Sequence, residues 1–217
     1  MTGSVSRRQL AVMLGLAPLA GALGAAATPP RKWAEISPRD RIRDRHFPNV
    51  ELVTQLGEKV RFYDDLIKDK LVVINFMYAT CEGVCPKVMH NLGRVQKLLG
   101  DRVGRDIFLY SITLKPQLDT PEVLATYAEM HGLGPGWLLL TGAPGDVELL
   151  RRRLGFVDPD PEVDRDTSNH IGNVRYGNEP LTRWGSCPGM SDPQWIVESI
   201  LWLDWPQQER DEKGARS

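Results

Sequence analysis

The chain has 217 residues, of which 41% are hydrophobic and 25% are charged, and its formal net charge at neutral pH is −1. This composition is typical of globular proteins, so it excludes collagen-like, coiled-coil and wholly disordered chains. The near-neutral charge provides no basic surface for nucleic acid, so nucleic-acid binding is not expected. We therefore predict a single folded domain with a hydrophobic core of its own.

The first residues have the layout of an export signal. Two adjacent arginines, Arg7 and Arg8, precede an apolar run from Leu10 to Ala27 that ends in three alanines. A positive segment, an apolar segment and a small-residue cleavage site make up a secretory signal, and paired arginines are typical of the twin-arginine pathway. We interpret residues 1–27 as a twin-arginine-type signal peptide of a periplasmic or otherwise extracytoplasmic protein. If the run were not cleaved, it would tether the protein to a membrane.

The rest of the chain divides into an arm, a domain and a tail. Residues 28–46 carry prolines and charges of both signs with little apolar periodicity, which predicts a linker or a surface arm. The domain is expected over residues 47–205, and a polar tail over residues 206–217.

Within the domain, strand and helix patterns alternate. The first half is predicted to hold a hairpin of Val50–Thr54 and Lys59–Phe62, a buried strand at Leu71–Met77, a helix from about Val84 to Leu99 and a strand at Ile107–Ile112. A helix from Pro121 to about His131, a strand at Trp137–Leu140 and a helix at Asp146–Leu154 are predicted to follow. The domain is then predicted to end with a hairpin of Val174–Tyr176 and Leu181–Trp184, which turns at Gly177-Asn178, and a last helix from about Ser191.

This order of elements predicts a small α/β sandwich, in which a central mixed β-sheet is flanked by helices and extended by an N-terminal hairpin. Residues 158–166 are expected to form an acidic, solvated loop, because their spacing fits no calcium-binding pattern. Four of the six tryptophans lie between residues 184 and 205. We attribute them to packing of the last helix, with Trp195 on its packed side.

The most informative motif is a pair of cysteines, Cys81 and Cys85, directly after the predicted strand Leu71–Met77. Residues four apart stack on one face of a helical turn, so the two sulfurs can converge. Near a helix N-terminus, unpaired N–H groups and the helix dipole favour thiolate over thiol. Such a pair suits a soft metal ion or a reversible disulfide. A purely structural disulfide is less favoured, since so short a loop removes little chain entropy.

A copper site with two thiolates needs a third donor, and imidazole suits copper. His46 lies at the end of the arm, and His131 closes a predicted helix. His90 follows Cys85 by five residues and points to another face of the same helix. His170 ends a polar stretch before the last hairpin. The residues alone leave the choice of the third ligand open.

Together these motifs resemble the Sco/SenC family, thioredoxin-fold copper proteins of cytochrome c oxidase assembly. The resemblance covers residues 47 to about 203 and is carried by the buried strand, Cys81-x-x-x-Cys85-Pro86, Asp119-Thr120-Pro121, Leu140-Thr141-Gly142 and a lone histidine before the last hairpin. It implies a thioredoxin-like sandwich and a site for Cu(I) or Cu(II) formed by Cys81, Cys85 and His170.

The sequence departs from the family's pattern near this site. Glu82-Gly83 stands where the family has Pro-Asp, and two acids of the family are replaced by Asn169 and Lys115. These changes are expected to alter the hydrogen bonds and the charge around the ligands but leave the ligands intact. Cys187 lies outside the family's ligand set. We favour a packed, unpaired thiol there over a resolving cysteine or an extra metal donor.

The resemblance implies a copper metallochaperone, rather than an enzyme, that assists assembly of a copper centre in a respiratory oxidase. Its partner would be the oxidase copper subunit or another cuproprotein. The alternative is a thiol–disulfide oxidoreductase that reduces cysteines of a partner cuproprotein, in which Cys81 attacks and Cys85 resolves. The C-x-x-x-C spacing counts against that alternative, because disulfide exchangers commonly have C-x-x-C. A binding module with vestigial cysteines, or a peroxidase, is less favoured still.

Overall fold

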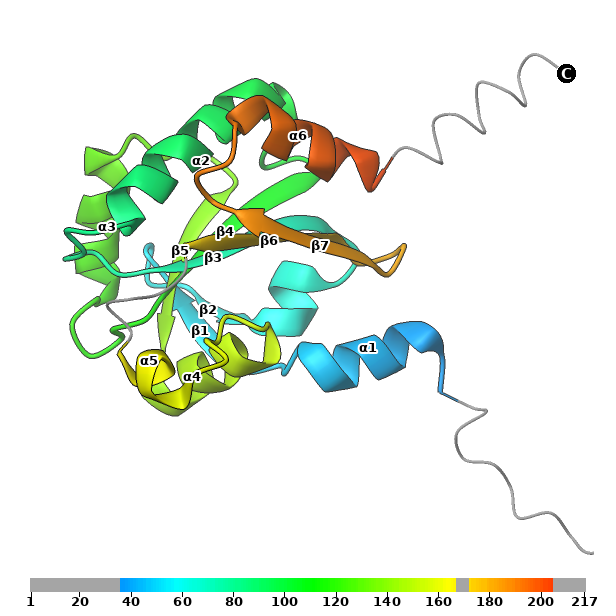
Figure 1. Cartoon of the computed structure of the whole chain (residues 1–217), viewed down its shortest axis with the longest axis horizontal. Coiled ribbons are helices and arrows are strands. Elements are labelled where there is room, and N and C mark those ends of the chain that lie inside the picture. The colour runs from blue at the N-terminus through cyan, green and yellow to red at the C-terminus, as the bar shows by residue number, and fades with distance from the viewer. Residues whose placement is uncertain (1–35, 167–171, 205–217) are drawn as a thin grey trace, which may run out of the picture. The chain divides into compact units, whose positions relative to one another are not determined.

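A computed structural model describes residues 36–166 and 172–204. Over these residues the chain forms a seven-stranded mixed sheet in the order β2-β1-β5-β4-β3-β6-β7 (Figure 1). The strands are β1 Glu51–Thr54, β2 Lys59–Arg61, β3 Leu71–Met77, β4 Ile107–Thr113, β5 Trp137–Gly142, β6 Asn173–Asn178 and β7 Arg183–Pro188. The helices are α1 Pro38–His46, α2 Cys85–Leu99, α3 Pro121–Met130, α4 Pro144–Arg153, α5 Pro161–Arg165 and α6 Pro193–Trp202, with a π-helical turn at Phe62–Ile67 and a 3₁₀ turn at Gly100–Arg102.

Three parallel strands form the centre of the sheet. β4 pairs in parallel with β3 on one side and with β5 on the other. The hairpins β1–β2 and β6–β7 extend the two edges, and each joins the centre in antiparallel register. Every residue of β3 is buried, which is why its sequence is a nearly continuous apolar run. The predicted sandwich, with its mixed sheet and N-terminal hairpin, is confirmed.

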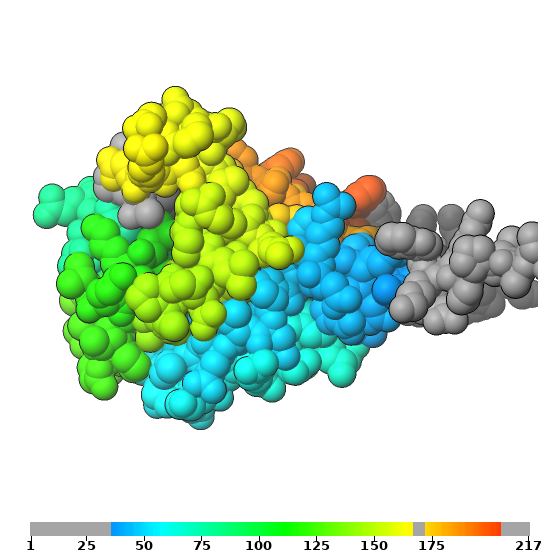
Figure 2. All heavy atoms as spheres, turned by 90° about the horizontal axis from the view of Figure 1, so that it is seen from below, coloured from blue at the N-terminus to red at the C-terminus, as the bar shows by residue number. Residues whose placement is uncertain are grey.

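Side chains of β3 alternate between two hydrophobic clusters on opposite faces of the sheet. Val73 and Met77 belong to the cluster under α2, α3 and α6, whereas Val72 and Ile74 belong to the cluster under the π-helical turn and α4. Figure 1 shows α2, α3 and α6 on one side of the sheet and α1 and α4 on the other. Figure 2 shows α1 lying beside α4, where Arg153 donates a hydrogen bond to the carbonyl oxygen of Arg45 at 2.9 Å.

One helix forms where the sequence analysis predicts only a linker or an arm. Pro38–His46 are helical, and the Ser37 hydroxyl accepts a hydrogen bond from the amide of Asp40 at 3.0 Å. A serine N-cap followed by proline is a standard helix start. The helix escapes a search for apolar periodicity because it is almost entirely charged, and Ile42 alone packs onto the core.

The last hairpin and the tryptophans also differ from expectation. Gly177 and the residue after it lie inside β6, so the strands are longer and the turn falls later than predicted. A Cβ atom at Gly177 would lie 2.0 Å from the ring of Trp184, so only glycine allows that ring to lie on β6.

Trp195 and Trp202 are 48% and 64% exposed, so packing of the last helix does not account for them. The predicted acidic loop contains the short helix α5.

The terminal predictions lie largely outside the structure. The predicted signal peptide, residues 1–27, and the predicted polar tail, residues 206–217, are outside the described residues. Across residues 36–166 and 172–204, no helix combines the length and the apolar character that crossing a membrane requires.

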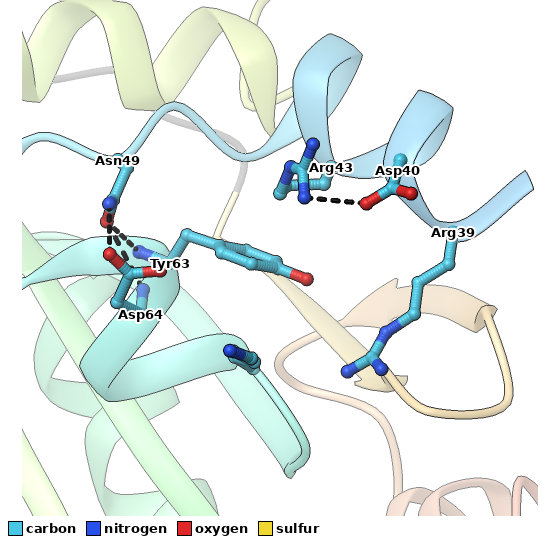
Figure 3. Close-up of a pocket in the computed structure, with 7 residues that line it drawn as sticks. Arg39, Asp40, Arg43, Asn49, Tyr63 and Asp64 are labelled. Carbon is cyan, nitrogen blue, oxygen red and sulfur yellow. Dashed lines mark hydrogen bonds and ion pairs between the residues drawn. The ribbon is translucent and has the colours of Figure 1, made fainter. Parts of the chain in front are cut away.

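A buried carboxylate anchors α1 to the β6–β7 hairpin. The side chain of Glu179 is 4% exposed and accepts hydrogen bonds from Arg39 Nε at 2.7 Å, the Tyr63 hydroxyl at 2.8 Å and the Asp69 amide at 2.9 Å. Burial raises the pKa of Glu179, but these hydrogen bonds outweigh it and hold the pKa below its ordinary value. Figure 3 shows Arg39 descending from α1 at the rim of a pocket of about 430 Å³ that Tyr63 and Arg43 also line.

Replacing Arg39 with methionine should lower the free energy of unfolding by about 2–3 kcal/mol at pH 7, because a buried carboxylate loses its cationic partner. Urea unfolding measures this, with the exposed Arg41→Met on the same helix as the matched control. The folded pKa of Glu179 is lowered, so its contribution is present above the ordinary value of 4.5 and is lost as pH falls through the lower folded value. Equal stability of the two variants at pH 7 would contradict the anchoring role.

Candidate metal and redox site

The two cysteines lie at the carboxyl end of β3, where the chain leaves the sheet at Tyr78 and enters α2 at Cys85. The carboxyl ends of parallel strands meet at one edge of a sheet, so the segment that follows β4, Leu114–Thr120, lies beside this turn. Ligands of open α/β sheets bind outside these carboxyl ends. The turn therefore occupies the position in the fold that most often holds a functional site.

Hydrogen bonds join the two cysteines directly. Cys81 is 6% exposed and Cys85 is 1% exposed. The sulfur of Cys81 accepts hydrogen bonds from the Cys85 thiol, from the amides of Cys85 and Gly83, and from the Tyr78 hydroxyl. The sulfurs therefore converge as predicted, although Cys81 lies in the irregular turn before α2 and not on a turn of the helix.

The two thiols differ in acidity. Burial raises the pKa of Cys81, but the hydrogen bonds that its sulfur accepts more than offset burial and lower the pKa below its ordinary value. Burial raises the pKa of Cys85, and the hydrogen bond that it donates to Cys81 raises it further. The hydrogen bond to Cys81 and burial together raise the pKa of Tyr78 to about 12, so its hydroxyl stays a donor. The pair thus combines a thiolate-prone sulfur with a protonated neighbour.

A buried carboxylate fixes the chain just before Cys81. Asp119 is 1% exposed and accepts hydrogen bonds from the Ala79 amide at 3.0 Å and from the Thr113 hydroxyl. The same hydroxyl accepts from the Lys115 amide at 2.9 Å, and the Asp119 amide donates to the Lys115 carbonyl at 2.9 Å. Asp119 therefore ties the segment after β3 to the segment after β4.

Three residues of this site have no contact predicted for them from the sequence, where Asp119 is named only as part of the family motif and Lys115 only as a change of charge near the ligands. Besides Asp119 these are Tyr78 and Lys115, whose ammonium lies 3.9 Å from the centroid of the Tyr78 ring. A signal exists for two of them, because Tyr78 directly follows a buried strand and Asp119 directly precedes the capping residue Thr120. No sequence pattern indicates that Lys115 lies over an aromatic ring.

The third predicted ligand, His170, lies outside the described residues. Of the other histidines, His46 ends α1 and contacts the carbonyl of Arg153, His90 is exposed on α2, and His131 ends α3 against the Tyr127 ring. Among residues 36–166 and 172–204, no group of three or more histidines, cysteines and carboxylates has the geometry to hold a metal ion.

The residues on both sides of the undescribed segment 167–171 lie close to the cysteine turn. A Cβ atom at Gly172 would be 2.9 Å from the side chain of Val84, the residue before Cys85. The Gly172 carbonyl is held there by the Gly189 amide at 2.8 Å. On the other side, Asp166 is near enough for its charge to raise the pKa of Tyr78.

Cys187 lies apart from the pair in the sequence, on strand β7, where it is 4% exposed and not disulfide-bonded. Burial raises its pKa to about 11. The predicted packing of this thiol is confirmed.

Comparison with known proteins identifies relatives of the chain. A family model described as SCO1/SenC matches residues 40–175. A putative copper-binding protein of Stutzerimonas stutzeri is 30% identical over 135 residues, which cover 61% of this chain and 64% of that protein. A SCO2-like protein of Rickettsia prowazekii is 27% identical over 121 residues, which cover 56% of this chain and 57% of that protein. The matches thus span less than two thirds of the length of these curated relatives.

Solved structures share the fold. A SCO1/SenC family lipoprotein from Bacillus anthracis has a TM-score of 0.58 at 22% identity, covering 71% of this chain and 92% of its own. Arabidopsis thaliana ScoI with copper bound has a TM-score of 0.55 at 16% identity, covering 70% of this chain and 94% of its own. These similarities confirm the thioredoxin-like sandwich.

Replacing Asp119 with asparagine should lower the free energy of unfolding by about 1.5–3 kcal/mol, because two hydrogen bonds to a buried charged acceptor are weakened. The amide of Ala79 should also exchange faster with deuterium than in the parent, which hydrogen-exchange mass spectrometry measures. The exposed Asp101→Asn is the matched control and should change neither quantity appreciably. Unchanged protection of Ala79 in Asp119→Asn would show that the carboxylate does not hold this segment.

Proposed function

This chain belongs to the SCO1/SenC family, and on that premise we propose that it is an extracytoplasmic copper metallochaperone that assists assembly of a copper centre in a respiratory oxidase. The observation that carries the proposal is the convergence of Cys81 and Cys85 at the carboxyl end of β3. Copper is the cargo of such a protein, and the oxidase copper subunit or a similar cuproprotein receives it.

The donors suit this cargo. Thiolates are soft ligands that prefer Cu(I), and imidazole suits either oxidation state of copper. A metal-ligating thiol must lose its proton. Cys81, whose pKa is lowered, supplies the first thiolate, and the proton of Cys85 leaves when the ion binds.

His170 completes the proposed set as the third ligand. It is two residues from Gly172, so their Cα atoms can be at most about 7 Å apart along the chain. Gly172 packs on Val84, next to Cys85, so the covalent reach of the chain supports His170 as a ligand. The proposed extracytoplasmic location is supported by Arg7, Arg8 and the apolar run that follows them.

The full-length reduced protein should retain one Cu(I) against a competing chelator. Changing Cys81 or Cys85 to serine, or His170 to alanine, should weaken retention by about 10- to 100-fold or more, because each change removes a donor. Cys187→Ser and His131→Ala are the matched controls and should retain copper as the parent does. Copper content after chelator competition measures this. A parent that gives up copper as readily as Cys81→Ser would refute the metallochaperone.

The unequal acidity of the two thiols favours a second candidate, a thiol–disulfide oxidoreductase that acts on a partner cuproprotein. The Cys81 thiolate would attack a disulfide of the partner, form a mixed disulfide and release one partner thiolate. Cys85 would then lose its proton and attack the Cys81 sulfur, releasing the second partner thiol. Two electrons pass to the partner, and the Cys81–Cys85 disulfide remains.

In this second candidate, Cys85→Ser should accumulate a mixed disulfide with a model disulfide peptide, whereas Cys81→Ser should form none through this pair. His170→Ala should exchange within about twofold of the parent rate, because the histidine takes no part in thiol exchange. The pH profile of Cys81 alkylation should have its midpoint below that of an ordinary thiol, because the hydrogen bonds to its sulfur lower the pKa of Cys81. Peptide mapping by mass spectrometry follows each cysteine. Exchange that depends on His170 would contradict this mechanism.

A further inference from the structure

We propose that the outer face of α2 and α6 docks onto an anionic lipid bilayer. Two tryptophans of α6, Trp195 and Trp202, would lie among the lipid headgroups, and Lys87 and Arg94 of α2 would bind lipid phosphates. These four residues and Leu98 form what we call the α2/α6 face. The inference goes beyond the proposed function, because none of these side chains is needed to bind copper or to exchange thiols.

The two tryptophans on α6 are exposed on one side of the helix. Trp195 and Trp202 are seven residues apart, so they lie on the same side, whereas Ile196 and Ile200 bury the opposite side in the core. They are 48% and 64% exposed. Tryptophan is enriched at membrane interfaces and at protein interfaces, because it combines a large apolar ring with one polar N–H group. The pair therefore indicates a surface that another body covers, and the charge around it identifies that body.

A stripe of α2 lies beside α6. The two helices contact each other on one side of the sheet (Figure 1). The Asn91 side chain donates to two carbonyls of the loop that leads into α6, at 2.9 and 2.7 Å, so its side of α2 is next to α6. Lys87, Arg94 and Leu98 lie four residues before Asn91 and three and seven residues after it, which places them on the same stripe. All three are exposed.

The charge on this surface is mostly positive. Helix α2 has no acidic residue, and Glu198 is the single carboxylate within α6. Among residues 36–166 and 172–204, no carboxylate forms an ion pair with Lys87, Arg94 or the exposed Lys97. Basic residues beside tryptophan and leucine are typical of helices that lie in the interface of an anionic membrane. The charge of the face thus complements anionic lipid.

The course of the chain favours a bilayer over an acidic protein as the body that covers the face. The apolar run Leu10–Ala27 tethers the chain to a membrane if it is retained. The described chain starts nine residues after this run, so it can begin at most about 30 Å away from it. Arg39 near this start binds Glu179, and the preceding residue, Asn178, binds Asp204 just after α6 at 2.9 Å. The chain therefore enters the domain close to the end of α6.

Docking would also place the cysteine turn near the membrane. Helix α2 begins at Cys85, two residues before Lys87. A bilayer that binds Lys87 therefore lies close to the turn. On the proposed function, the cysteine pair would then meet its partner at the membrane surface.

The test uses the metal-free, full-length protein in vesicles of phosphatidylcholine, alone or with about one third phosphatidylglycerol. The apolar run can insert into both, so vesicle binding alone does not test the face. Acetylation of lysines by a succinimidyl ester, read by mass spectrometry, shows instead which side chains the lipid covers. Lys87 and Lys97 should react about three- to tenfold more slowly with phosphatidylglycerol than without it. Lys68, exposed on the other side of the sheet, should change less than about twofold.

Substitutions of the tryptophans test their part in docking. Trp195→Ser combined with Trp202→Ser should return the acetylation of Lys87 to within about twofold of its rate in phosphatidylcholine. Leu56→Ser combined with Leu149→Ser is the matched control, since it removes exposed apolar side chains from the β1–β2 hairpin and α4. This control should protect Lys87 as the parent does.

Substitutions of the cations test the attraction to anionic lipid. Arg94→Gln combined with Lys97→Gln should reduce the protection of Lys87 about two- to threefold, because two charges near the lipid are lost. Arg41→Gln combined with Arg45→Gln removes two exposed cations from α1 and should leave this protection unchanged. Urea unfolding of each variant verifies that folded proteins are compared.

Equal acetylation of Lys87 in the two kinds of vesicle would overturn the inference, and so would an equal slowing of Lys68. Full protection in the variant without Trp195 and Trp202 would overturn it as well. Protection that arises without vesicles and grows with protein concentration would show that a second copy covers the face, not lipid. Because no copper is present, the result stands whether or not the protein proves to be a metallochaperone.

Discussion

The cysteine turn depends on one buried carboxylate, that of Asp119. It accepts from the Ala79 amide and the Thr113 hydroxyl, and so it joins the segments that leave two neighbouring parallel strands. A carboxylate with 1% exposure is costly to bury without such partners. The hydrogen bond to the Ala79 amide also fixes the chain where the turn begins. Because Ala79 lies between Tyr78 and Cys81, the positions of both residues depend on it.

From this fixed point, burial and hydrogen bonding make two chemically identical side chains different. Cys81 lies where donors converge and has a lowered pKa, whereas Cys85 lies deeper, keeps its proton and donates a hydrogen bond to Cys81. This difference in pKa between the two thiols suits both metal binding and thiol exchange, because each begins with one deprotonated cysteine. Whether the pair binds an ion or exchanges electrons is therefore decided by what else reaches it: a third donor for copper, or a partner disulfide.

Most of the scaffold can be predicted from local sequence signals, because β3 is a continuous apolar run and α3 has a threonine cap before proline. The convergence of Cys81 and Cys85 is predicted from their spacing, although an irregular turn before α2 brings them together rather than a turn of helix. Two parts could not be predicted, for physical reasons. The helix α1 is held by Arg39 and the distant Glu179 rather than by an apolar stripe, and the position of Lys115 over Tyr78 depends on contacts between loops of different strands.

The burial of Cys187 bears on oxidative folding. A chain with three thiols can form three different intramolecular disulfides, and only one of them joins Cys81 to Cys85. The four-residue loop between those two closes far more readily than a loop of about a hundred residues to Cys187. Cys81, Cys85 and Cys187 are about equally buried, but Cys187 lies in β7, which pairs with β6, whereas Cys81 lies in the irregular turn before α2. Once β7 has joined the sheet, an oxidant therefore reaches Cys187 only if the hairpin opens. The native sheet thus protects the odd thiol from scrambling and leaves the pair as a self-contained unit.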